Sequence, residues 1–308
     1  MAGNQERRRR PSPDELAGLA GRLLPRPALE ALLAGALRGL GVCLCLHRIA
    51  ARPRPTDWQP GLSMPAPELD ELIELLVAAR PARVSITFDD GYRDAAAYIR
   101  ARAARFPGVD FIFFVCPEKA ELRAGFRWDL VEERLKRSAT DAHAPLEEPV
   151  NVEQENHRPD LRALSEGDYG LCTIDELKAL WKTPNVQLGN HTNLHLSSAK
   201  SPDETVRADF ERSTATFTRL FGAPRHFAFP FGTPRHHFGQ RHVEWLRALG
   251  EAQIWTTEAR PFRPGEVEPG AVLPRFPVDG SKDARTLAGW IAARALDFRA
   301  RGSKHHFP

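Results

Sequence analysis

The sequence predicts an α/β protein built on a parallel sheet, because segments typical of strands and of helices alternate along most of the chain. One expected strand, 111–115, is wholly apolar (FIFFV), as in strands that helices cover on both faces. Polar residues follow several of the strands, and in parallel sheets functional groups gather at this edge. The alternation alone does not decide whether the sheet is open or closed.

Short apolar segments bounded by turn residues mark the other strands. The first strand leads directly from a helical segment and ends at His47. Later strands end at a pair of aspartates, at Gly189 and before Pro230, so several strand ends carry special residues. Besides 111–115, strands are expected at 41–46, 84–88, 186–188, 226–229, 253–257 and 272–275.

The helices have recognisable start and stop signals. A capping box, TIDE at 173–176, opens one helix. Another begins with Ser201 as its cap and Pro202 in its first position, and Gly222 stops it. Helices are expected over 68–80, about 94–105, 173–181 and 201–222.

The chain divides into three parts of unequal size. Residues 1–38 form an N-terminal extension with a basic tail (RRRR, 7–10) and a helix. Residues 39–300 form the main domain, and 301–308 form a tail. A segment near 137–170 is rich in Pro, Glu and Asn and lacks periodicity, which predicts a surface insertion in the main domain.

The apolar segment 28–46 contains Glu30 and Arg38 and has no uncharged core followed by a cleavage site. We interpret it as a helix that runs into the first strand, and not as a signal peptide or a membrane span. With no clear span and no leader, a cytoplasmic location is expected.

Charge and cysteine content exclude some classes of function. Lys and Arg number 43 against 40 Asp and Glu, which gives a net charge of +3 and no reason to expect nucleic acid binding. Cys43 and Cys45 lie two apart in an apolar strand, and no second pair with Cys116 or Cys172 has metal-ligand spacing. Buried free thiols are therefore expected, which favours a reducing compartment.

Two motifs indicate chemistry at the strand ends. Asp89 and Asp90 follow the strand 84–88, and adjacent carboxylates do not help an apolar strand to fold. His191 and His195 lie four apart, so both imidazoles can reach one ion, and a carboxylate would complete a catalytic zinc set. Taken singly, the aspartates are also compatible with a turn or helix cap, and the histidines with a surface pair.

Three motifs occur in order, each after an expected strand: TFDDGY, HTNLH and FAFPFG. This combination resembles the polysaccharide deacetylase family, the NodB-homology domains of carbohydrate esterase family 4, from about residue 42 to about residue 278. CLCLHRI and LSMPAPELDELIELL resemble the opening of its exopolysaccharide-deacetylase branch. The resemblance implies a single distorted (β/α) barrel after the helical N-terminal extension.

The resemblance also implies roles for particular residues. Asp90, His191 and His195 would hold a divalent metal, usually zinc, and Asp89 would be the general base. The backbone N–H of Phe231, directly after Pro230, would help to hold the oxyanion.

The sequence departs from the family at two points. The family's arginine two residues before the motif's proline is replaced by Ala228, and Arg275 in LPRFPV could supply the charge from another strand. The usual late histidine is missing, since His305 and His306 lie in the tail. His47 in CLCLHRI matches the histidine of the exopolysaccharide branch and could be the general acid, across the pocket from Asp89; a core histidine is the alternative.

The expected function is metal-dependent removal of N-acetyl from an amino sugar within a glycan or glycoconjugate, with release of acetate. Two alternatives remain open: deacylation of another amide or ester, such as a formyl group, and a non-catalytic glycan-binding or assembly protein on the same fold. Trp128 and Trp255 could stack on sugar rings or fill the core, and core packing is the default expectation for both.

Overall fold

A computed structural model describes residues 12–50, 60–130, 157, 159–164, 167 and 169–301. The basic run at 7–10, most of the expected insertion near 137–170, and the tail after residue 301 lie outside these residues.

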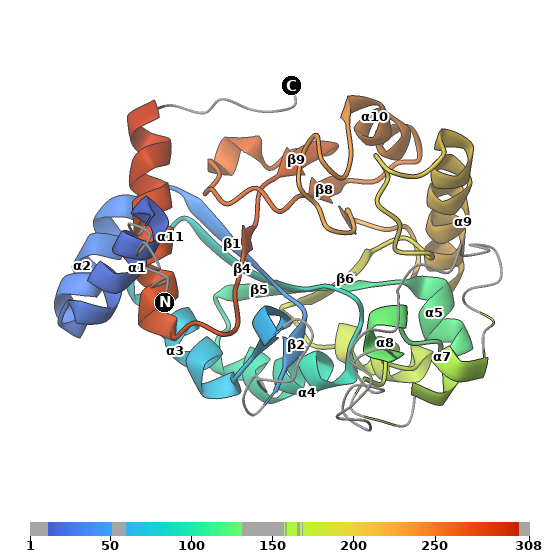
Figure 1. Cartoon of the computed structure of the whole chain (residues 1–308), viewed down its shortest axis with the longest axis horizontal. Coiled ribbons are helices and arrows are strands. Elements are labelled where there is room, and N and C mark those ends of the chain that lie inside the picture. Colours follow the sequence, from blue (N-terminus) through green and yellow to red (C-terminus); the bar gives the residue numbers. More distant parts are fainter. Residues whose placement is uncertain are drawn as a thin grey trace, which may run out of the picture.

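The fold is organised around one sheet of eight parallel strands (Figure 1). The strand order is β10-β1-β4-β5-β6-β7-β8-β9, and each neighbouring pair is parallel. A separate short pair joins β2 (Arg48–Ile49) to β3 (Ser63–Met64). The main strands are β1 (Gly41–Leu46), β4 (Arg83–Phe88), β5 (Val109–Val115), β6 (Val186–Asn190), β7 (His226–Ala228), β8 (Gln253–Trp255), β9 (Ala271–Leu273) and β10 (Phe276–Pro277).

The two edge strands of this sheet are consecutive in the chain. β9 ends at Leu273 and β10 begins at Phe276, so only Pro274 and Arg275 connect opposite edges. Three Cα–Cα steps span at most about 11 Å, so the sheet must curl far enough to bring the ends of its two edge strands within that distance. The expected distorted (β/α) barrel is thus confirmed. The strand expected at 272–275 is shorter than expected, because the chain leaves β9 at a proline, which has no N–H for the ladder, and starts a new strand at the other edge.

Helices cover the outside of the curled sheet (Figure 1). The capping box at Thr173 is confirmed, and its helix begins at Ile174. The expected start at Ser201 is wrong: Pro202, with φ −58° and ψ 137°, is the extended cap and the helix begins one residue later. The helices are α1 (Pro13–Leu23), α2 (Arg26–Leu37), α3 (Ala66–Ala78), α4 (Arg93–Arg102), α5 (Pro117–Leu122), α7 (Pro159–Ala163), α8 (Ile174–Trp181), α9 (Asp203–Phe221), α10 (Gln240–Ala248) and α11 (Ala284–Arg301).

The core has a large outer layer and a smaller interior. The outer layer packs α2, α3 and α11 against the apolar faces of β1, β4 and β5. Inside the curl, Cys43, Phe114 and Trp255 are fully buried in one cluster. Trp255 therefore fills the core, as expected. All four cysteines are buried and free, which confirms that prediction.

None of the helices in the described part of the chain is long and apolar enough to cross a membrane.

The N-terminal helix α1 packs closely on α11 through small residues. A Cβ added to Gly289 on α11 would lie 2.4 Å from the carbonyl oxygen of Ala17 and 2.7 Å from the Cα of Gly21. The two backbones therefore touch where they cross, a contact that Ser12 supports by capping α1 through a capping box with Glu15.

We expect Gly289→Ala to lower the free energy of unfolding by about 1–3 kcal/mol, because the added methyl overpacks this crossing. Urea denaturation of both proteins measures the difference. Gly35→Ala on α2 is the matched control, since nothing lies within 4 Å of its Cβ position and alanine is favoured over glycine within a helix by roughly 0.5–1 kcal/mol. Equal stability of Gly289→Ala and the parent would contradict the close crossing.

Candidate active site

The carboxyl ends of β4, β6 and β7 bring the expected site residues together. Asp89 and Asp90 follow β4, and both are nearly fully buried. His191 follows β6 directly, and the loop after it returns His195 to the same place. Parallel strands end at one edge of the sheet, so residues distant in sequence meet there.

Asp90, His191 and His195 form a compact set of metal-ligating atoms. Asp90 Oδ1 lies 3.1 Å from Nε2 of His195 and 3.6 Å from Nε2 of His191. A tetrahedral zinc ion with bonds of about 2.0–2.1 Å holds its ligand atoms about 3.3 Å apart. Asp90 Oδ1 is also buried without a hydrogen bond to any described residue. Two imidazoles and one carboxylate at these spacings fit a divalent cation.

The environment of His191 prepares one nitrogen for a cation. Its Nδ1 lies 2.8 Å from the carbonyl oxygen of Ala228, which can only accept, so Nδ1 carries the proton and Nε2 faces Asp90. Burial lowers the pKa of His191 to about 4. The ring is therefore neutral at neutral pH, with its Nε2 lone pair free to bind a metal.

Positive φ angles are concentrated in the backbone of this site. Asp90 (φ 74°), Thr192 (φ 64°), His195 (φ 53°) and Phe231 (φ 60°) all adopt a conformation that non-glycine residues rarely take. Such conformations cost about 1–3 kcal/mol each and persist where surrounding contacts enforce them. The loops are thus shaped for the positions of their side chains and N–H groups.

Asp209 on α9 holds the histidine loop. Its carboxylate accepts the backbone N–H groups of Asn193 (3.1 Å) and Leu194 (3.3 Å). The loop closes on itself where Thr192 Oγ1 accepts the N–H of His195 at 3.0 Å. Sequence reasoning missed Asp209, because it looks like any helical aspartate until the loop is seen to fold over it.

Arg275 binds Asp89 with both of its terminal nitrogens. Nη1 donates to Oδ1 at 2.6 Å and Nη2 donates to Oδ2 at 2.9 Å. The guanidinium is fully buried and also donates to Thr87 Oγ1 and to the carbonyl of Thr256. Burial is the largest single effect and would raise the pKa of Asp89, but the charge and hydrogen bonds of Arg275, together with the neighbouring histidines, hold that pKa well below the ordinary range.

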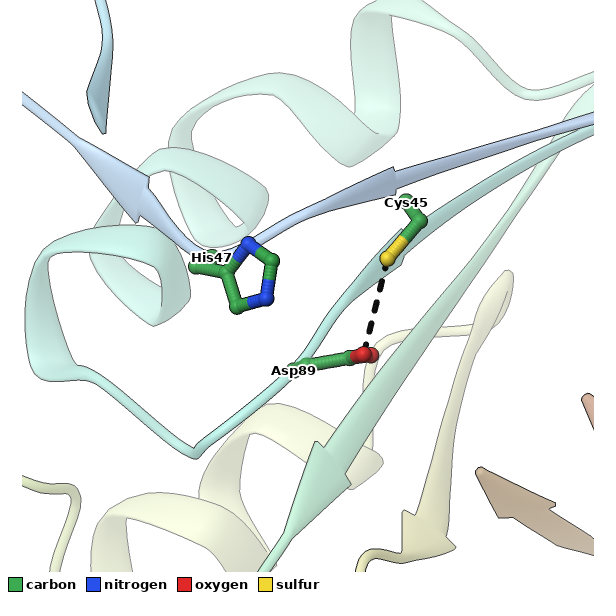
Figure 2. A group of neighbouring side chains, drawn as sticks. All are labelled: Cys45, His47 and Asp89. Carbon is green, nitrogen blue, oxygen red and sulfur yellow. Dashed lines mark hydrogen bonds between the residues drawn. The ribbon is translucent and has the colours of Figure 1, made fainter. Parts of the chain in front are cut away.

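His47 and Cys45 reach Asp89 from the end of β1 (Figure 2). Cys45 Sγ donates to Asp89 Oδ2 at 3.5 Å, and burial raises the pKa of this thiol well above its usual value. A ring nitrogen of His47 lies within 4.8 Å of both groups. His47 is therefore a close neighbour of Asp89, whereas the sequence predicts a position on the opposite side of the pocket. These three do not form a second metal set, because Arg275 occupies both Asp89 oxygens and repels a cation.

Aromatic rings line the other side of the site. Phe231 is 51% exposed, and its ring meets His195 edge-on at 5.1 Å. Among the contacts of the described chain, its N–H has no acceptor. Trp128 is partly buried and lies 4.9 Å from His195, so unlike Trp255 it borders the site. Phe126 stacks on Trp128 at 4.4 Å.

A carboxylate-lined edge of a curled parallel barrel, with two histidines beside it, is the type of site that hydrolases use. The polysaccharide deacetylase family model matches residues 77–250, more than half of the 308 residues. The chain therefore belongs to the polysaccharide deacetylase family. The matched segment contains Asp89, Asp90, His191, His195 and Phe231, whereas the two remaining expected site residues lie outside it, His47 before and Arg275 after.

Solved structures share the fold at low sequence identity. A polysaccharide deacetylase from Bacillus cereus has 13% identity and a TM-score of 0.52 over 82% of this chain and 69% of its own. IcaB from Ammonifex degensii has 21% identity and a TM-score of 0.50 over 82% and 97%. A de-N-acetylase from Aggregatibacter actinomycetemcomitans has 13% identity and a TM-score of 0.52 over 81% and 99%. No curated protein matches the sequence significantly.

A buried acid, Glu251, supports the start of the histidine loop through Asn190. Asn190 Nδ2 donates to Glu251 Oε1 at 3.2 Å, and Asn190 Oδ1 accepts the N–H of Thr192 at 3.1 Å. Glu251 is 2% exposed, and burial raises its pKa to about 8 despite hydrogen bonds from Asn190 and Thr214. At neutral pH the folded protein thus keeps a proton on Glu251 that the unfolded chain releases near pH 4.5.

Because the folded protein binds this proton more tightly than the unfolded chain, the contribution of Glu251 to the free energy of unfolding falls as pH rises. The contribution of Glu251 is fully present below about pH 4.5 and is lost as pH rises through about 8. We expect Glu251→Gln, which cannot ionise, to lose less stability than the parent between pH 5 and pH 9. Urea denaturation at both pH values measures this, with the exposed Glu244→Gln as control. Parallel pH profiles for parent and Glu251→Gln would contradict a neutral Glu251.

Proposed function

We propose that this protein is a metal-dependent deacetylase that removes N-acetyl groups from amino sugars in a glycan or glycoconjugate, releasing acetate and a free amine. One observation carries the proposal: Asp90, His191 and His195 converge beside the Asp89–Arg275 pair at the strand-end edge of a barrel of this family. The exopolysaccharide-deacetylase branch is the favoured subgroup, because CLCLHRI, which contains His47, resembles its opening and LPRFPV could supply the missing charge through Arg275. The proximity of both side chains to Asp89 supports this choice.

Asp90, His191 and His195 are the proposed ligands of a divalent ion, with zinc first among the candidates. When bound, such an ion supplies Lewis-acid polarisation to water and to the amide carbonyl. Asp89, Phe231 and His47 are each proposed to act on a different part of the amide, and the position of each residue in the fold supports its role.

Asp89 is the proposed general base. Its depressed pKa keeps it ionised throughout the neutral range, and its Oδ2 lies 4.0 Å from Nε2 of the proposed ligand His191. Water next to that ligand set is therefore within reach of the carboxylate, which accepts a proton as the water oxygen attacks the amide carbon. Arg275 orients Asp89 by its paired hydrogen bonds and leaves proton transfer to the carboxylate.

Phe231 and His47 are proposed to act on the two ends of the amide. The N–H of Phe231, which has no acceptor among the described residues, donates to the oxyanion that forms when water adds to the carbonyl. The leaving nitrogen needs a proton before the C–N bond breaks, and His47 supplies it as general acid. Base and acid thus come from neighbouring strands, Asp89 from β4 and His47 from β1.

The direct test is acetate release from N-acetylglucosamine oligomers with and without chelator, together with elemental analysis. We expect about one divalent ion per chain and activity that chelation abolishes. Asp89→Asn should keep the metal and lose roughly 10²–10⁴-fold in kcat, because an amide cannot accept the proton. Asp90→Ala is the matched variant that should lose the metal itself.

Other results would redirect the assignment. Release of formate or of another acid from a non-sugar amide would identify a different deacylase. Glycan binding without turnover in the metal-loaded protein would identify a binding or assembly role. Asp89→Asn within a few-fold of the parent would place the base elsewhere.

His47→Ala should retain the metal and lose activity on N-acetyl substrates, with a much smaller loss on activated esters. The reason is that an amine leaves only after protonation, whereas the leaving group of an activated ester needs no proton. Steady-state kinetics on a matched amide and ester pair measure the difference. Equal losses on both substrates would sink the acid role and leave His47 as a structural neighbour of Asp89.

A further inference from the structure

The two histidines of the proposed metal set differ in how their rings are supported. A metal-binding histidine usually donates its second ring N–H to a carbonyl or carboxylate, which fixes the ring plane. His191 follows this pattern through the Ala228 carbonyl. His195 does not, because its Nδ1 is buried and has no hydrogen-bond partner among the described residues. Something other than a hydrogen bond must hold the ring of His195.

Aromatic rings surround His195 closely enough to take this role. Its ring centroid lies 4.9 Å from that of Trp128, 5.1 Å from Phe231 and 5.4 Å from Phe126. The contacts are tilted or edge-on, which is the favoured geometry for such pairs and stabilises them beyond simple burial. We call Phe126, Trp128 and Phe231 the aromatic cage of His195.

Trp128 is the member of this cage that other side chains fix in place. Its Nε1 donates to the hydroxyl of Tyr92 at 3.0 Å, and that hydroxyl donates to Asp129 at 2.9 Å. Phe126 stacks parallel to the indole, with 11° between the planes.

The anchor of Trp128 belongs to the same turn as the carboxylates. Tyr92 is the second residue after Asp90, and it is 1% exposed. One short segment therefore places both Asp90 and, through Trp128, the ring of His195. A displacement of Trp128 would free the His195 ring to rotate away from Asp90.

We infer that Trp128, held by Tyr92 and Asp129, is a positioning residue that fixes His195 in place of the missing hydrogen bond. The inference rests on the proposed metal set and names no contact with substrate. Loss of a neighbouring group that orients a metal ligand commonly weakens metal binding 10–100-fold. Loss of Trp128 should weaken metal binding by a comparable factor, although Trp128 contributes no ligand atom.

The experiment measures the zinc dissociation constant of the full chain by competition with a chromogenic chelator. We expect Trp128→Ala to bind zinc roughly 10–100-fold more weakly than the parent. Trp128→Phe, which keeps a ring beside His195, should restore most of the affinity. Tyr92→Phe removes the acceptor of the indole N–H and should give a smaller loss in the same direction. Trp181→Ala, a half-exposed tryptophan on α8, is the matched control and should not change affinity.

The outcomes separate this inference from the proposed function. Zinc affinity of Trp128→Ala within twofold of the parent would overturn it, provided circular dichroism shows a folded protein. If that variant does not fold, Tyr92→Phe at parental affinity would overturn it. A parent that binds no divalent ion would overturn the cage together with the ligand set. Tight zinc binding without acetate release would overturn the proposed reaction alone.

Discussion

The ion pair between Arg275 and Asp89 connects the segment that closes the barrel with the candidate active site. Arg275 lies in the two-residue link between β9 and β10, where the sheet edges meet, and its guanidinium reaches Asp89 at the end of β4. Both charges are buried, so removing either partner would leave an uncompensated ion, at a cost of about 3–5 kcal/mol. Since Arg275 also binds Thr87 and the Thr256 carbonyl, the path of the chain at the closure and the ionised state of Asp89 depend on each other.

The same pair accounts for two adjacent carboxylates after an apolar strand. Asp90 has φ 74°, so the backbone turns between the two residues and their side chains serve different partners. Asp89 takes both nitrogens of Arg275, whereas Asp90 Oδ1 has no hydrogen-bond donor among the described residues and faces the Nε2 atoms of the two histidines. One carboxylate is neutralised by a side chain of the protein. The other is the proposed ligand of a cation, and a buried charge without either partner would be costly.

Much of this arrangement could be predicted from the sequence, and the reasons for the remainder are physical. Alternating apolar segments identify β1, β4 and β5, and the motifs place Asp89 and His191 at strand ends, because local patterns specify both. The edge-to-edge link at Arg275 could not be read from periodicity, since β10 has only two residues. Asp209 and Trp128 were also beyond local patterns: their roles come from contacts with a loop distant in sequence. Tertiary packing decides such contacts, and no spacing rule encodes them.

The substitution of Ala228 for the family's usual arginine fits the location of Arg275. Ala228 is fully buried in the interior cluster that also contains Phe114, and the guanidinium of Arg275 lies over the Phe114 ring at 5.2 Å from its centroid. An arginine at position 228 would need this same space and would bring a second cation to Asp89. The backbone carbonyl of Ala228 accepts from His191 Nδ1 at 2.8 Å. In this chain the charge that orients Asp89 therefore comes from the β9–β10 link, and Ala228 on β7 contacts a proposed metal ligand through its backbone.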